Sequence, residues 1–547
     1  MSRENLIIAG SSFLLPFHPD WKTLEKSYQV SFAEFGNILK SLNQDNCDDV
    51  LAIILILEDI IDFNKDDSKI IDSKLALVFE SITLRVSNSR KSTIIIPVSV
   101  TLQNVVDEAK YESLEIATYR KLTNSLRDIA NKYTGFYLID SSLFYSKHSK
   151  EAIFDNRNWY FSHSRFSLMG ISLFITGIKD VLNRTKAPAS KVLVLDCDNT
   201  LWGGVIGEDL ITGITLGEDG LGEAFQDFQK EIKRLLNRGV LICLASKNNE
   251  KEVWEVFSSH RGMILKKDDI SHWRINWNSK STNLIEISED LGLNLDSFVF
   301  WDDNPIEREE VKSQLQNVKV VEVPKNVEDW PQMLRNLSYF TKFEITNEDI
   351  EKNKQYKNLT KFNLEFKKTL DRKSFLNSIE MEMETHILAA DNLRRAEQLS
   401  LKTNQFNLRK QRYSSSEIQQ INNLDQSVME LVSLRDRFGD HGTIAMFGLT
   451  KIENGVFFLN TFLLSCRAIG REVEVWMMKR IKSKCLELNA HTLYAEYVKT
   501  EKNQIADNFL ESQGFAKVAE NNFIFQKLKK SHIGIDGIIY TVKLEQK

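Results

Sequence analysis

A multidomain α/β fold is predicted for this chain of 547 residues, which has room for about three domains. In residues 1–186, short apolar runs alternate with helical patterns, which is typical of a parallel sheet with helices on both faces. In residues 187–325, three apolar runs each end in acidic or hydroxyl side chains. In residues 380–547, a long apolar run leads through a short turn with glycine into a helical pattern.

The first region, residues 1–186, is expected to contain five strands. They are predicted at residues 6–9, 30–32, 50–57, 93–98 and 136–139. Helical patterns at 33–42, 73–85 and 114–132 lie between them. The polar, proline-containing stretch 183–190 then predicts a domain boundary.

The second region, residues 187–325, opens on KVLVLDCDNTLWGG at 191–204. Its apolar run predicts a buried parallel strand, and Asp196 and Asp198 follow at the carboxyl end, where open α/β sheets bind ligands. In phosphoryl chemistry, Asp196 could act as nucleophile and Asp198 as general acid and base. Thr200 and the turn amides could hold phosphate oxygens. The alternative is an ordinary polar turn after a strand.

Two later strands bring further polar residues to the same expected edge. Ser246 follows the run 240–245, and Asp302 and Asp303 follow the run 297–301. A hydroxyl at a strand end suits a phosphate oxygen, and carboxylates suit Mg²⁺. Between the two strands, Lys280 supplies a fixed positive charge for phosphate. The predicted Mg²⁺ ligands are Asp196, Asp198, Asp302 and Asp303.

The connections between these strands are short. The stretch GGVIGEDLITGITLG at 203–217 predicts a small hairpin, and 221–236 predicts an amphipathic helix. No gap between the site residues holds a large cap domain, which needs roughly 50 residues or more. The site is therefore expected to be open, which suits a large substrate such as a carrier protein with a prosthetic arm.

Residues 326–379 are rich in lysine and glutamate and predict a connecting segment of solvated helices. In residues 380–547, the strand 456–464 runs into Ser465-Cys466-Arg467-Ala468-Ile469-Gly470-Arg471 and a helix at 472–488. Backbone amides at a helix N-terminus after such a turn can bind an anion.

The chain resembles the haloacid dehalogenase (HAD) phosphatase superfamily, in its subfamily IIIC. The residues that carry this resemblance are, in order, Asp196 and Asp198, Ser246, Lys280, and Asp302 and Asp303. The wording LDCDNTLWGGVIGED, ASKNN, WNSKS and FWDDNPIERE, with KTNQFN, RDRFGDHG and SCRAIGRE, resembles the narrower FkbH-like branch. This resemblance implies a Mg²⁺-dependent enzyme that takes a phosphorylated three-carbon acyl donor, such as 1,3-bisphosphoglycerate. It implies that the enzyme removes a phosphate and loads the glyceryl group onto an acyl carrier protein in polyketide biosynthesis.

The first region looks similar to the SGNH-hydrolase-like domain of FkbH-like proteins. An active esterase would use Ser11 or Ser12 as nucleophile and His163 as base. The hydrolase pattern has one Asp beside its Ser and another three residues before its His. Here no Asp flanks the serines, and Tyr160 stands at the second position. We therefore expect a non-catalytic structural or carrier-docking domain.

The spacing Arg467-x-x-Gly470 resembles the acyl-CoA-binding loop of GNAT acetyltransferases, which implies a GNAT-like α+β domain. Glu472 stands where that loop has Gly or Ala, and its carboxylate would repel a pyrophosphate. The resemblance therefore favours the single phosphodiester of a phosphopantetheine arm as the ligand, with Arg467, Gly470 and Arg471 as the binding residues.

Two interpretations of Cys197 are open. It is either a buried cysteine that acts as a small hydrophobe or a thiol that receives the acyl group near the phosphate. Cys466 is a second candidate thiol. For the whole chain, the alternatives are a simple phosphatase acting on a small phosphometabolite and a scaffold that docks carrier proteins.

The composition bears on nucleic-acid binding, on membrane insertion and on the location of the protein. With 71 basic and 76 acidic residues and a net charge of −5, the chain gives no overall argument for nucleic-acid binding. The longest apolar run, 50–57, is far shorter than the ~20 residues that span a bilayer, and no signal peptide is expected. The five cysteines form no disulfide or C-x-x-C pattern, so a cytoplasmic location is expected.

Overall fold

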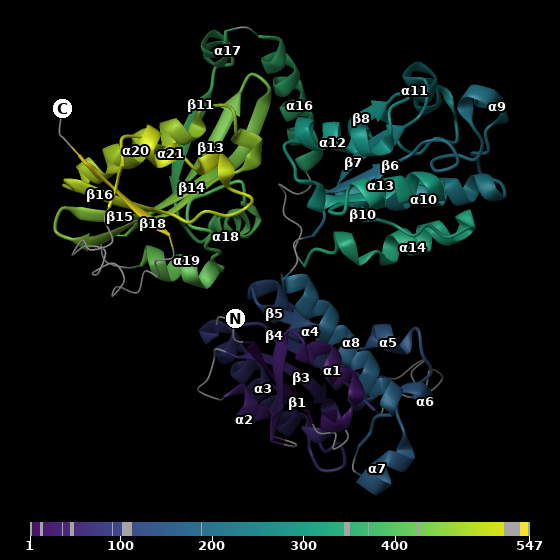
Figure 1. The fold of residues 1–547 in the computed structure, drawn as a ribbon. Helices are drawn as coiled ribbons and strands as arrows, with labels where there is room; N and C mark the ends of the chain where they lie inside the picture. Colours follow the sequence, from purple (N-terminus) through teal and green to yellow (C-terminus); the bar gives the residue numbers. More distant parts are fainter. Residues whose placement is uncertain are drawn as a thin grey trace. The chain divides into compact units, whose positions relative to one another are not determined.

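The computed structural model forms two compact units, Met1–Ala187 and Pro188–Lys547, each of which is described by itself. The described residues are 3–10, 15–34, 37–43, 49–89, 91–100, 112–162, 164–186, 189–343, 351–369, 371–423, 427–518 and 537–544. Ser11, Ser12 and His163, the esterase candidates, lie outside them. The predicted multidomain α/β class is confirmed by the sheets (Figure 1).

The first unit is built on a five-stranded parallel sheet in the order β2-β1-β3-β4-β5. The strands are β1 Glu4–Ala9, β2 Tyr28–Phe32, β3 Val50–Ile56, β4 Thr93–Val98 and β5 Phe136–Leu138. The helices are α1 Lys22–Glu25, α2 Ile38–Leu42, α3 Ser68–Asn88, α4 Leu114–Lys132, α5 Ser142–Tyr145, α6 Lys150–Ile153, α7 Asn156–Ser162 and α8 Leu168–Lys186. All five predicted strands form, in a doubly wound strand order.

Side chains alternate between two cores, one on each face of this sheet. On one face, even-numbered strand residues such as Ile54 and Ile96 pack against α1 and α8. On the other face, residues such as Ile53 and Ile95 pack against α2, α3 and α4. Period-two alternation in fully buried strands produces this arrangement.

Two helices of the first unit begin elsewhere than their patterns predict. The helix expected over 33–42 begins at Ile38, because the Asn37 side chain accepts a hydrogen bond from the Lys40 amide at 3.1 Å. The helix expected from residue 73 begins at Ser68, where Asp67 caps the Ile70 amide at 2.9 Å.

The second unit begins with another five-stranded parallel sheet, in the order β10-β9-β6-β7-β8. Its strands are β6 Val192–Leu195, β7 Leu241–Ser246, β8 Ile270–Ile275, β9 Phe298–Trp301 and β10 Lys319–Val320. Its helices are α9 Ile206–Gly213, α10 Leu221–Asn237, α11 Glu250–Ser259, α12 Lys280–Leu291, α13 Pro305–Gln314 and α14 Trp330–Asn336. Helices α10, α11 and α14 cover one face, and α12 and α13 cover the other.

The predicted hairpin at 203–217 is wrong. Residues Ile206–Gly213 form α9, and only an isolated bridge between Gly203 and Thr215 closes the segment. The Asp209 carboxylate accepts a hydrogen bond from the Val205 amide at 2.7 Å and so holds the first turn of α9, which is kinked at Leu210, where φ is +58°.

The expectation of solvated helices in residues 326–379 is also wrong. Helices α16 Lys352–Lys368 and α17 Arg372–Ser378 add buried side chains to the core beside β6, β7 and β9. Tyr356, Leu359 and Phe362 of α16 lie on one face of the helix at a helical spacing. Helix α16 contacts β8 and α12 on one side and β14 on the other, so it is packed from two directions.

The C-terminal region is a mostly antiparallel sheet in the order β11-β13-β14-β15-β16-β18-β17, with β12 paired to β15. Its strands are β11 Glu382–Ile387, β12 Phe406–Asn407, β13 Val428–Asp436, β14 Gly439–Glu453, β15 Val456–Leu464, β16 Thr492–Tyr497, β17 Ala516–Lys517 and β18 Ile538–Lys543. Its helices are α18 Leu393–Lys402, α19 Ser415–Asn422, α20 Val473–Glu487 and α21 Phe509–Ser512. Strands β15 and β16 are parallel.

None of the helices in the described part of the chain is both long and apolar enough to cross a membrane.

Candidate active site

The predicted site residues gather at the carboxyl edge of the second unit's parallel sheet. The central strand β6 lies between β7 and β9, and the chain passes to β7 and β8 before it returns to β9 on the other side. This reversal is a topological switch point, where open α/β sheets form a ligand crevice. Asp196 follows β6 at this edge, and Asp302 follows β9.

Lys280, the first residue of α12, joins the strand ends. Its side chain is 2% exposed, and its Nζ lies 2.5 Å from Asp196 Oδ1 and 3.0 Å from Asp302 Oδ2. It also donates a hydrogen bond of 2.7 Å to the carbonyl oxygen of Ala245. Burial alone would lower the pKa of Lys280, but the two carboxylates outweigh it and hold the pKa above its usual value.

Three carboxylates form a group that could hold a metal ion. Ligand oxygens of Asp196, Asp302 and Asp303 all lie within 4.8 Å of one another. With all three ionised and Lys280 charged, two negative charges are left uncompensated, and burial raises the pKa of Asp302 and of Asp303. A hard divalent cation such as Mg²⁺ fits both the oxygen donors and the charge.

Asp198 stands apart from this group, so the cluster holds three of the four predicted ligands. One oxygen of its carboxylate accepts hydrogen bonds from Trp202 Nε1 at 3.0 Å and the Ile206 amide at 3.1 Å. The other accepts from Asn248 Nδ2 at 2.8 Å. Burial raises the pKa of Asp198, which suits a proton donor, although these hydrogen bonds oppose the shift.

The two predicted phosphate-binding hydroxyls have protein partners. Thr200 Oγ1 donates to Asp303 Oδ1 at 3.1 Å and so links the first turn to the acid pair. Ser246 is buried and its side chain hydrogen-bonds the Cys197 thiol.

Three residues of the site were not singled out from the sequence. Asn248 holds Asp198, and Arg308 Nη1 donates to the carbonyl oxygens of Asp302 and Asp303, both at 2.7 Å. Lys247 Nζ lies 2.6 Å from Glu307 Oε1, which joins the segments after β7 and β9. All three lie inside the stretches ASKNN and FWDDNPIERE, which begin at the ends of predicted strands, and this position was the available signal.

Cys197 lies in the apolar core. It has no exposed surface and shares the cluster of Leu193 and Leu195, on the face that strand alternation assigns to odd-numbered residues. Burial and the neighbouring Asp196 charge raise its pKa well above the usual value, against a smaller opposite effect of the Ser246 hydrogen bond. The thiol is therefore protonated and shielded in this state.

We expect Cys197 to resist alkylation by iodoacetamide in the native protein and to react only after denaturation. The physical reason is that the thiolate is the reactive form and burial disfavours it. Partly exposed Cys466 provides the comparison within the same chain. Mass spectrometry of the labelled peptides gives both rates, and native labelling of Cys197 at the rate of Cys466 would contradict the burial seen here.

The C-terminal loop has the predicted strand–turn–helix order, with Gly470 at φ +90° and no atom within 4 Å of the place where a Cβ would stand. Arg471, however, is fully buried and is not presented to a ligand. Its Nε lies 2.9 Å from Asp436 Oδ2, its Nη1 donates to the Arg467 carbonyl at 2.9 Å, and its guanidinium lies 3.8 Å from the centre of the Phe362 ring. The prediction that Arg471 binds pantetheine is therefore corrected. Its side chain pairs with Asp436 and packs against Phe362 of α16.

Arg467, the other predicted arginine, is also largely buried, and its Nε lies 3.4 Å from Ser465 Oγ. Beside it, Cys466 Sγ lies 3.6 Å from the hydroxyl of Tyr356 on α16. Of the three predicted pantetheine-binding residues, Gly470 is therefore the one with free space beside it.

No protein-family model and no curated protein matches this chain. Among solved structures, it is similar to the N-terminal part of protein BF1531 from Bacteroides fragilis, which contains a phosphatase domain complexed with Mg. The two are 24% identical, with 63% of this chain and 96% of that chain covered and a TM-score of 0.55. This likeness concerns the fold.

Two acetyltransferases also match part of the chain. One, of the GNAT family from Staphylococcus aureus Mu50, is 12% identical over 30% of this chain and 100% of that chain, with a TM-score of 0.24. The other, spermidine N-acetyltransferase from Vibrio cholerae in complex with CoA and spermine, is 16% identical over 30% of this chain and 95% of that chain, with a TM-score of 0.22.

Proposed function

We propose that this protein is a Mg²⁺-dependent HAD-type phosphatase that dephosphorylates a phosphorylated three-carbon acyl donor and loads the acyl group onto an acyl carrier protein. The observation that carries the proposal is the contact of Lys280 with Asp196 and Asp302 at the switch point of the sheet. Burying an ammonium among carboxylates costs stability, so a site of this kind favours catalysis over a scaffold role.

The residues divide the phosphate chemistry between them. Asp196 would attack phosphorus, and Asp198 would give a proton to the leaving oxygen and later take one from the incoming nucleophile. Lys280 would hold Asp196 in place and offset charge on the phosphate. Asp196, Asp302 and Asp303 would hold Mg²⁺, which offsets the negative charge of the bound phosphate.

The open surroundings of the site support a protein as acyl acceptor. Residues 196–269, all of which the structure describes, hold α9, α10, α11 and one short 3-10 helix between the strands, so these connections form no cap domain with its own core. Because Cys197 is shielded, we favour direct transfer over an acyl group held on Cys197. Asp196 would break the phosphate ester of the donor, and the carrier thiol would attack the carbonyl carbon of its acyl phosphate, so that the thioester forms and the second phosphate leaves. The proposed partner is thus a phosphopantetheinylated carrier protein.

We expect EDTA in excess to stop phosphate release and added Mg²⁺ to restore it. The reason is that three carboxylates and one ammonium leave a net negative site that repels phosphate without a cation. A phosphate-release assay with 1,3-bisphosphoglycerate measures the effect, and full activity in excess EDTA would rule out the metal role of Asp302 and Asp303.

Intact-protein mass spectrometry of a carrier protein, incubated with the enzyme and the donor, tests the transfer. A glyceryl-sized mass increase on the carrier supports the proposal. Phosphate release that proceeds at the same rate without carrier, and without any carrier mass change, would instead identify a simple phosphatase.

A further inference from the structure

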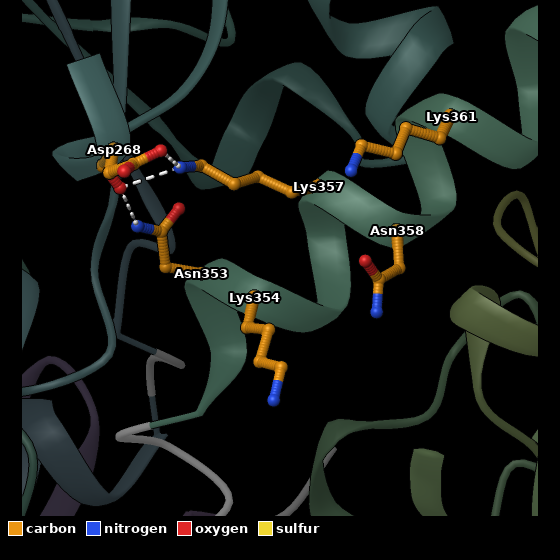
Figure 2. Close-up of a pocket in the computed structure, with 6 residues that line it drawn as sticks. All are labelled: Asp268, Asn353, Lys354, Lys357, Asn358 and Lys361. Atoms are coloured by element: carbon orange, nitrogen blue, oxygen red, sulfur yellow. Dashed lines mark hydrogen bonds and ion pairs between the residues drawn. The ribbon is translucent and has the colours of Figure 1, made fainter. Parts of the chain in front are cut away.

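A groove with lysines along one side runs beside α16, the helix that is packed between the parallel sheet and the C-terminal sheet of the second unit (Figure 2). Its volume is about 330 Å³. The lining residues are Asp268, Asn353, Lys354, Lys357, Asn358 and Lys361. Asp268 precedes β8, and the other five belong to α16.

The three lysines form a row on the helix surface. Lys354, Lys357 and Lys361 follow one another at spacings of three and four residues, which places them on one side of an α-helix. The row extends over about 10 Å at a rise of 1.5 Å per residue. Because Tyr356 and Phe362 anchor the buried face of α16 in the core, the backbone that presents the row is held in place.

Among the described residues, a protein partner is found for one lysine of the row. Lys357 Nζ donates to the Asp268 carbonyl at 2.6 Å and lies 3.4 Å from its carboxylate (Figure 2). Asn353 Nδ2 donates to the same carbonyl at 3.2 Å. Lys354 and Lys361 are exposed and have no acidic partner among the described residues. Asp268 is the single acidic side chain of the lining, so the groove carries excess positive charge on a chain whose net charge is −5.

From the C-terminal sheet, the turn between β13 and β14 approaches α16 at Asn358. A Cβ on Gly439 would lie 2.7 Å from Asn358 Nδ2, and the backbone at φ +141° is a conformation that favours glycine. The helix is therefore set by contacts on both sides, and the charged row keeps its spacing.

We propose that this groove, the α16 lysine groove, is a docking surface for an acidic helix of a partner protein. Carboxylates spaced at three and four residues on one helix match the length and spacing of the lysine row. A single phosphate group is much shorter than the row. Nucleic acid does not fit, because the lining offers no aromatic side chain for base stacking and the chain as a whole is acidic.

The groove lies near the amino end of β8, whereas Asp196 and Asp302 lie at the carboxyl edge of the same sheet. Six strand residues separate these edges by roughly 20 Å. A partner held in the groove would therefore reach the catalytic edge only through a long flexible arm. If the proposed transfer holds, the carrier protein is this partner, but the existence of the docking surface does not depend on it.

The test uses the full-length protein and a fluorescein-labelled synthetic helical peptide with glutamates at matching three- and four-residue spacings. Fluorescence anisotropy at low ionic strength should show saturable binding that weakens as salt is added. The double variant Lys354→Glu/Lys361→Glu should bind at least about tenfold more weakly. Lys479→Glu/Lys543→Glu, the same charge change at two exposed lysines outside the groove, should bind as the wild type does.

Equal loss in both double variants, or no binding by the wild type, would overturn the proposal. Displacement of the peptide by inorganic phosphate, at concentrations where sodium chloride of equal ionic strength has no effect, would identify a small-anion site instead. Phosphate release should be unchanged in all four substitutions. If the wild type releases no phosphate, the proposed function fails while the binding result still decides on the groove.

Discussion

Replacing Asp196 with asparagine is expected to abolish phosphate release, by at least about 10³-fold, while the protein stays folded. The substitution removes the nucleophile and one charge of the carboxylate group but keeps the shape of the side chain. Lys280 retains Asp302 at 3.0 Å and the Ala245 carbonyl at 2.7 Å, so its ammonium is not left without partners. Phosphate release measures activity, and circular dichroism measures folding.

Asp227→Asn is the matched control. Asp227 lies on α10, where it pairs with Lys230 three residues away, and it is not part of the carboxylate group at the strand ends. This control should keep wild-type activity because an exposed pair of this kind contributes little. If Asp196→Asn retained activity within a few-fold of the wild type, Asp196 would not be the nucleophile, and the proposed reaction would fall with it.

Replacing Arg471 with alanine is expected to lower the free energy of unfolding by about 3–5 kcal/mol. The change removes the guanidinium from the fully buried Asp436 carboxylate and leaves it beside the His441 ring, whose Nε2 lies 2.9 Å away. It also removes the guanidinium that lies over the Phe362 ring. Urea denaturation followed by tryptophan fluorescence gives the difference, and exposed Arg412→Ala should change stability by less than about 1 kcal/mol.

The loss of stability caused by Arg471→Ala should become smaller at low pH. Arg471 and His441 lower the pKa of Asp436 despite its burial. A lowered carboxyl pKa stabilises the fold above the unfolded value of about 4, and this contribution is lost as the pH falls below it. The wild type and Arg471→Ala should therefore converge in stability as the pH falls below about 4. An equal stability difference at pH 7 and pH 3 would show that the ion pair is not its source.

The local sequence determined the positions of the functional residues in this protein, at the ends of its predicted strands. Each functional segment is a short apolar run followed at once by polar residues, as in Val192–Leu195 with Asp196 and Phe298–Trp301 with Asp302. Such runs form buried parallel strands, and parallel strands end at a common edge. The five strands of the first unit and the helix α10 follow from the same periodicity, because the pattern of buried side chains is written into neighbouring residues.

Only the tertiary structure decided which side chains face the site and which face the core. Asp198 turns to Trp202 and Asn248, Cys197 enters the apolar cluster of Leu193, and Arg471 is buried against Asp436 and Phe362. The sequence of α16 is rich in lysine, and it did not indicate that one face of the helix would be buried between two sheets. These outcomes depend on partners far away in the sequence, because burial and ion pairing are set by the packing of neighbouring elements and local periodicity cannot specify those neighbours.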